Sequence, residues 1–250
     1  MNQDPKLLEG FHGAVAALDT QARAWVVVVA RLVDLEPRGP FSDDEMRQLI
    51  DEATAAGDFP SGPMAYAPEH EEYEEYEVNP DYHLLTVRSR LAGEPYLESK
   101  IAFGIAGFLA EGFTRSGRIT DDGDVHPSHV LLIDLEAVLA ETILLLSRAA
   151  RMLGYVGPGR IMAGIAAEVP AHPLRLRALD ERTGDLMDPG PPVEEFEPLT
   201  VDLTIGGSRA DAHRRCYEAI TSVAPQFGVS KPQYFTHPDQ GTDDYDLGQP

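Results

Sequence analysis

The residues best suited to chemistry gather in the segment 120–129, which reads TDDGDVHPSH. It holds three aspartates and two histidines, and the histidines have HxxH spacing. Carboxylate oxygens and imidazole nitrogens both bind divalent metals, so Asp124, His126 and His129 are candidate metal ligands. Two observations argue against a metal site. The sequence offers no second pair of ligands. The glycine and the proline in this segment are typical of a turn, where aspartate is common for conformational reasons.

A second candidate pair is His213 with Cys216, three residues apart. A cysteine nucleophile needs an exposed thiolate and a third, orienting group. Cys216 falls instead on the apolar side of an expected helix, which favours a buried, unreactive thiol. The glycines between 154 and 159 follow a helix and carry no GKS or GKT, so they predict a turn rather than a phosphate loop. These patterns favour a non-catalytic role and identify no cofactor.

The most acidic stretch lies within 57–80, which contains four prolines and places six glutamates among nine residues. Like charges at this density repel one another and bury no core, which predicts an exposed linker or acidic arm. The alternative is a docking motif for a basic partner, with tyrosines as anchors. Its candidate contacts are Glu72, Tyr73, Glu75 and Tyr76.

The overall charge narrows the classes of partner. The 250 residues carry a net charge of -22, which argues against direct nucleic-acid binding and against attraction to anionic membranes. It is compatible with a solvated acidic surface, a basic partner or mimicry of a nucleic acid. The single cysteine suits a reducing compartment, and we expect neither a signal peptide nor a membrane span. We therefore expect a soluble cytoplasmic protein, and the preference for Arg over Lys, with much Ala, Gly and Pro, indicates a bacterial source.

The elements that would position these residues follow from periodicity. Apolar residues at steps of three and four predict a helix from Asp4 to about Leu35, and Ser42 with Glu45 forms a capping box that opens a second helix. The two predict a helical hairpin whose Trp25 is a candidate partner contact. Further along we expect a strand from residue 82, a hairpin over 100–119, a long helix over 130–153, strands over 161–169, 174–178 and 199–205, and a helix over 208–227.

These elements predict an α+β fold in which two amphipathic helices pack on an antiparallel sheet. The expected parts are an N-terminal helical hairpin (1–56), an acidic linker rich in Pro and Glu (57–80), an α+β domain (81–235) and a disordered polar tail (236–250).

One resemblance rests on the segment LLIDLEAVLAETILLLSRAARMLGYVGPGRIMAGI, the strand TVDLTI and a helix ending in APQFGVSKPQYF. Their order, covering about residues 82–235, resembles the C-terminal region of bacterial ATP-binding proteins that carry a Schlafen-type, AlbA-like DNA-binding domain. The DNA contacts of that family would lie N-terminal to this region, where the present chain has its hairpin and acidic stretch. The resemblance therefore implies no DNA-binding residue here.

Three functions are compatible with these patterns. The favoured one is a non-catalytic cytosolic protein that acts through protein–protein contacts, as a regulatory partner or by self-association. The second is an acidic mimic of nucleic acid that occupies the basic groove of a nucleic-acid-binding protein. The third is a metal-assisted hydrolase built on the loop 121–129.

Overall fold

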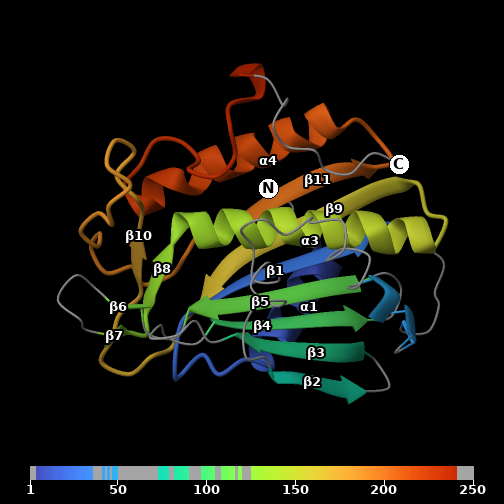
Figure 1. Ribbon diagram of the computed structural model, residues 1–250, viewed down its shortest axis with the longest axis horizontal. Coiled ribbons are helices and arrows are strands. Elements are labelled where there is room, and N and C mark those ends of the chain that lie inside the picture. The colour runs from blue at the N-terminus through green and yellow to red at the C-terminus, as the bar shows by residue number, and fades with distance from the viewer. Residues whose placement is uncertain are drawn as a thin grey trace.

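The computed structural model describes residues 4–35, 41–42, 44–45, 47–49, 73–78, 82–89, 97–104, 108–115, 118–119 and 125–240. A seven-stranded antiparallel sheet of order β11-β9-β1-β5-β4-β3-β2 forms its centre, with helices on both faces (Figure 1). The α+β class and the antiparallel sheet are thus confirmed. The sheet strands are β1 (Trp25–Leu32), β2 (Tyr73–Val78), β3 (Tyr82–Ser89), β4 (Leu97–Gly104), β5 (Phe108–Arg115), β9 (Gly157–Ala166) and β11 (Leu199–Ile205).

The main helices are α1 (Pro5–Ala16), α3 (Leu132–Met152) and α4 (Arg209–Val223). Two small ladders lie outside the main sheet: β6 pairs with β7, and β8 pairs in parallel with β10. Their bounds are β6 (Arg118–Ile119), β7 (Val125–His126), β8 (His129–Leu131) and β10 (Arg175–Arg177), and two short 3-10 helices are η3 (Ala224–Phe227) and η4 (Pro238–Gln240).

Strand β1 is an interior strand of the sheet and is buried on both faces. Val26, Val28 and other alternate residues face the core shared with α3, whereas Trp25, Val27 and Val29 face the core under α1. The helix expected to continue to Leu35 is therefore wrong beyond Ala16. A strand buried on two sides reads as an unbroken apolar run, and its β-branched valines favour the extended backbone.

Helix α1 packs closely on one face of the sheet, behind it in Figure 1. Gly10 makes this approach possible, because a Cβ atom there would lie 2.1 Å from the ring of Phe108 on β5. Asp4 caps the helix by accepting a hydrogen bond from the backbone N–H of Lys6 at 3.1 Å, and Pro5 follows at the first helical position.

Helices α3 and α4 cover the opposite face, as the sequence predicted. Both contribute to the larger core, α3 lying across β1, β5 and β9 and α4 lying over β11 (Figure 1). Strand β11 alternates buried and exposed residues along its whole length, as expected. Gly228 follows η3 with φ of 79°, the left-handed conformation that ends a helix.

The second N-terminal helix is present in part. Residues 44, 45 and 47–49 are helical, and Ser42 and Glu45 exchange the hydrogen bonds of the expected capping box. However, β1 separates this segment from α1 and pairs with β5 and β9. The predicted helical hairpin over 1–56 is therefore wrong, and its first half belongs to the main sheet.

The remaining predictions are mostly confirmed. The hairpin over 100–119 is β4 with β5, and the strand from residue 82 is β3. The predicted tail is ordered at its start, since Thr236 accepts a hydrogen bond from His213 at 2.8 Å and the His237 ring meets Tyr217. Residues 241–250 lie outside the described residues.

We expect Leu139→Ala in α3 to lower the free energy of unfolding by about 2–5 kcal/mol, because the side chain is fully buried against β1 and its neighbours. Val156→Ala, at a side chain that is 77% exposed, should change it by less than about 0.5 kcal/mol. Urea unfolding followed by the fluorescence of the single tryptophan measures both. Equal effects would contradict the packing of α3.

Candidate functional site

The predicted metal loop is described only in part. His126 and His129 stack with ring centroids 4.3 Å apart and an interplanar angle of 10°, whereas Asp124 lies outside the described residues. Among the residues that the structure describes, no three His, Cys, Asp or Glu side chains gather in the way a metal site requires. Because its third ligand is not described, the metal site stays a prediction.

The surroundings of His129 are positively charged. Burial first, and then the charges of His126, Arg177 and Arg175, lower the pKa of His129 to about 4. Its Nδ1 atom is buried with no hydrogen-bond partner among the described residues. A neutral imidazole could bind a metal, but a cation here would also meet two nearby guanidinium groups.

We expect His129 to stay neutral down to about pH 4, against an ordinary histidine pKa of about 6.5. Because the unfolded chain takes up this proton first, the contribution of His129 to stability should fall as pH falls through this window. An NMR titration of the imidazole protons, with His129→Gln to assign the signal, measures the pKa. A midpoint near the ordinary value would contradict the burial described above.

Trp25 is buried inside the protein and presents no surface to a partner. Its side chain is 0% exposed, its Nε1 donates to the carbonyl oxygen of Asp19 at 3.2 Å, and its ring lies in the core under α1. Arg23 and Lys100 place cationic groups 5.1 and 5.8 Å from the ring centroid. The prediction of a partner contact at Trp25 is therefore wrong, because it rested on an exposed helical hairpin that does not form.

The acidic stretch ends in a strand rather than in a linker. Tyr73, Glu75 and Tyr76 lie in β2, which pairs with β3 and, among the strands that the structure describes, is the last one on that side of the sheet. Glu72 and residues 50–71 lie outside the described residues. The linker predicted over 57–80 is thus wrong for residues 73–78, since an edge strand needs a partner on one side only and tolerates charge.

Two buried carboxyl groups meet between β5 and α3. Glu111 is 0% exposed, and its Oε2 lies 2.9 Å from the hydroxyl of Thr142, which also lies 2.8 Å from the carbonyl oxygen of Val138. One hydroxyl proton cannot serve both acceptors fully, whereas a protonated Glu111 can donate to Thr142. Burial raises the pKa of Glu111 to about 8, and Glu141 lies beside it.

We expect the contribution of Glu111 to stability to fall as pH rises from about 4.5 towards 8, because folded Glu111 holds a proton that the unfolded chain releases. Glu111→Gln keeps the shape and cannot ionise, so it should lack this fall. The slope of its free energy of unfolding against pH should differ from that of the natural protein by up to about 1.4 kcal/mol per pH unit. Urea unfolding at several pH values tests this, with exposed Glu218→Gln as control. Identical pH slopes for natural protein and Glu111→Gln would contradict protonation.

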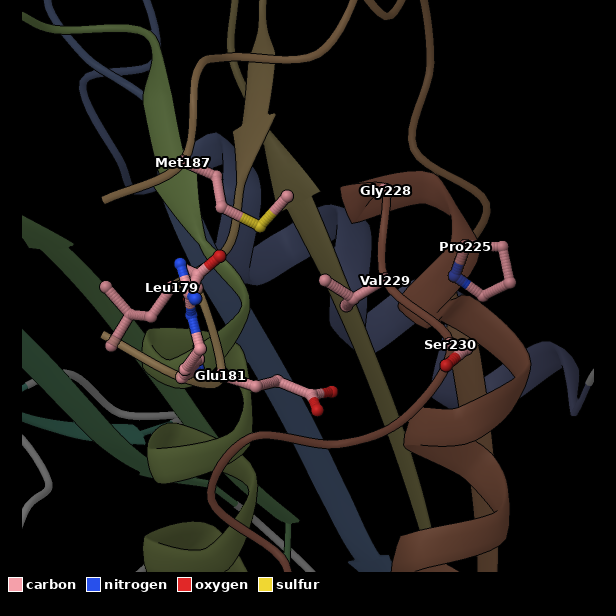
Figure 2. A pocket seen from close by; sticks show the side chains of 9 residues that line it. Leu179, Glu181, Met187, Pro225, Gly228, Val229 and Ser230 are labelled. Atoms are coloured by element: carbon pink, nitrogen blue, oxygen red, sulfur yellow. The ribbon is translucent and has the colours of Figure 1, made fainter. Parts of the chain in front are cut away.

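A pocket of about 720 Å³ lies between the segment after β10 and the C-terminal end of α4. Figure 2 shows Leu179, Glu181 and Met187 on one side of it, with Pro225 and Val229 among the residues opposite. The two sides come from segments more than thirty-five residues apart, so no local sequence pattern could have predicted the pocket. It is a shallow depression that is widely open to solvent rather than an enclosed cavity.

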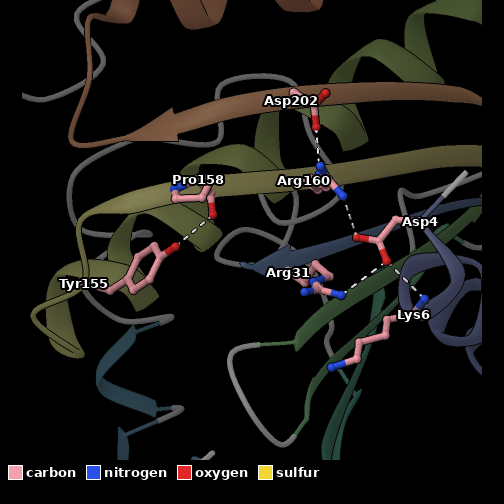
Figure 3. A network of polar contacts seen from close by, with 7 residues as sticks. All are labelled: Asp4, Lys6, Arg31, Tyr155, Pro158, Arg160 and Asp202. Carbon is pink, nitrogen blue, oxygen red and sulfur yellow. Dashed lines mark hydrogen bonds and ion pairs between the residues drawn. The ribbon is translucent and has the colours of Figure 1, made fainter. Parts of the chain in front are cut away.

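A charged network fastens the start of α1 to the sheet (Figure 3). Asp4 accepts from Arg31 on β1 at 3.3 Å and from Arg160 on β9 at 3.0 Å, and Arg160 also pairs with Asp202 on β11 at 3.1 Å. Burial raises the pKa of Asp4, but the hydrogen bond from Arg160 and the charge of Arg31 outweigh burial and lower it. Each charge has a partner, so we assign this network to structure.

Cys216 is buried as expected, and burial raises its thiol pKa to about 12. His213, the proposed partner, is within hydrogen-bond distance of the Thr236 carbonyl oxygen through Nε2. The pair therefore lacks the exposed thiolate that a nucleophile requires.

Comparison with known proteins finds no matching family model, no matching curated protein and no matching solved structure. The resemblance to proteins with a Schlafen-type, AlbA-like domain stays a prediction. Within the part of the chain that is described, no helix has both the length and the apolar character needed to cross a membrane.

Proposed function

We propose that this chain is a non-catalytic binding protein of the cytoplasm that acts through protein–protein contact. Its acidic edge strand β2 receives a basic, extended segment of a partner, which adds to the sheet as a further strand. The observation that carries this proposal is the coincidence of two features in one element. The stretch with six glutamates among nine residues ends in the strand that closes one edge of the sheet.

An edge strand offers backbone N–H and C=O groups to which a partner's extended segment can hydrogen-bond. Every second residue of β2 pairs its backbone with β3, and the alternate N–H and C=O groups point away from the sheet. A peptide can hydrogen-bond to these groups without any particular side chain, so charge and side-chain pockets then decide which peptide binds. Strand β2 also lies on the side of the sheet away from α4 (Figure 1).

Charge favours a basic partner over a second copy of this chain. Glu74, Glu75 and Glu77 all lie within β2, so two copies that paired through this edge would bring glutamates close together. Like charges on neighbouring strands destabilise a sheet, whereas opposite charges stabilise it by about 0.2–1 kcal/mol per pair. The net charge of -22 would also speed the approach of a basic partner.

The experiment uses two labelled peptides of equal length, one alternating Lys with Val and the other alternating Glu with Val. Fluorescence anisotropy should show that the basic peptide binds, that the acidic peptide does not, and that added salt weakens binding. Replacing Glu74, Glu75 and Glu77 together by Lys should weaken binding by about tenfold or more, equal to about 1.4 kcal/mol.

The matched control replaces Asp188, Glu194 and Glu195 by Lys, because these exposed residues lie in the proline-rich loop before β11 and give the same change in net charge. This variant should keep most of the binding. If both triple variants lose binding equally, attraction is due to overall charge and the assignment to β2 is wrong. Absence of binding by the basic peptide at low salt would also contradict it.

A further inference from the structure

Hydrogen bonds fix the two walls of the pocket between Leu179 and Val229, and only some of its charged side chains form ion pairs. From these two features we propose that it binds a small organic anion with an apolar body, such as a carboxylate on an aliphatic or aromatic group. This site is separate from the β2 edge, and its ligand is a small molecule rather than a protein.

The first wall is tied to the buried part of the fold. Gln233 exchanges two hydrogen bonds with the backbone of Leu179, and Arg177 donates two to the carbonyl oxygen of Met187 at 3.0 and 2.7 Å. Gln233 is held in turn by buried Glu136, whose carboxyl group accepts from three successive backbone N–H groups of residues 233–235. The wall is therefore preorganised, and a ligand need not order it.

The second wall is the end of the helical segment η3. Gly228 donates to the carbonyl oxygen of Pro225 at 3.1 Å, and Val229 donates to that of Ala224 at 3.3 Å. These bonds fix the turn that presents Val229 towards Met187 and Leu179 across the pocket (Figure 2). The three apolar side chains provide a surface for the hydrocarbon part of a ligand, and methionine adapts to its shape.

The charged groups on the rim differ in the partners that they already have. Glu181 pairs with Lys231 at 2.9 Å, which neutralises it. Asp180 accepts from the backbone N–H groups of Arg182 and Thr183 through Oδ1, so its carboxylate is already stabilised by donors. The guanidinium of Arg182 has no ion pair with the described residues and also lines the pocket. Because Arg182 is exposed and water solvates its charge, the guanidinium is available to bind a carboxylate or another planar anion through two parallel hydrogen bonds.

The test compares octanoate with octylammonium, which share an apolar tail and differ in charge. A titration followed by two-dimensional NMR of the amide groups should show octanoate shifting signals of residues 179–187 and 225–230. Octylammonium should bind more weakly by about fivefold or more, about 1 kcal/mol. Equal binding of the two compounds would overturn the assignment of an anion, and shifts confined to other residues would overturn the assignment of the pocket.

Substitutions at Arg182 separate the charge from the fold, because the side chain is exposed and its loss leaves the core intact. Arg182→Met should weaken octanoate about tenfold, whereas Arg214→Met, at an exposed arginine on α4, should not. Arg182→Glu should reverse the preference and favour octylammonium. If Arg182→Met and Arg214→Met bind octanoate alike, or natural protein shows no shift at about millimolar octanoate, the proposal is wrong.

Discussion

The burial of β1 on both faces is the constraint on which the rest of the structure depends. Its valines alternate between the core under α1 and the core under α3, so one strand joins both layers of helices to the sheet. It also pairs with β5 on one side and β9 on the other, which places the N-terminal residues between segments that follow them by about eighty and about one hundred and thirty positions. Loss of apolar contact here would weaken both cores together.

This arrangement explains which parts of the fold could be predicted from sequence. Strand β11 is buried on one face, so its alternation appears directly in the residues, and α3 shows the long apolar pattern of a buried helix. Strand β1 has no polar face and therefore no alternation, and its run of valines continues the helical spacing of α1. Because residues 25–32 were predicted to be helical, Trp25 was expected on the surface of an amphipathic helix, whereas it is a core residue.

The candidate sites also differ in how much of each could be predicted from the sequence. The glutamates from 69 to 77 identify an acidic stretch from composition alone, but only the strand order places its end at the edge of the described sheet. The pocket at Arg182 combines two segments that are distant in sequence, and its rigidity depends on Glu136, a buried carboxyl that a sequence pattern places only on a helix. A site whose residues all lie in one segment can be predicted from the sequence. A site whose residues come from several segments can be identified only once the fold is known.

Hydrogen exchange with mass spectrometry, with and without the alternating Lys-Val peptide, tests the central claim most directly. A peptide that adds to the sheet must protect backbone amides of the strand it joins. We predict slower exchange in β2 (Tyr73–Val78) on adding the peptide, with no change in β11 at the other edge. Protection that falls elsewhere, or exchange in β2 that does not change while the peptide is bound, would contradict the account.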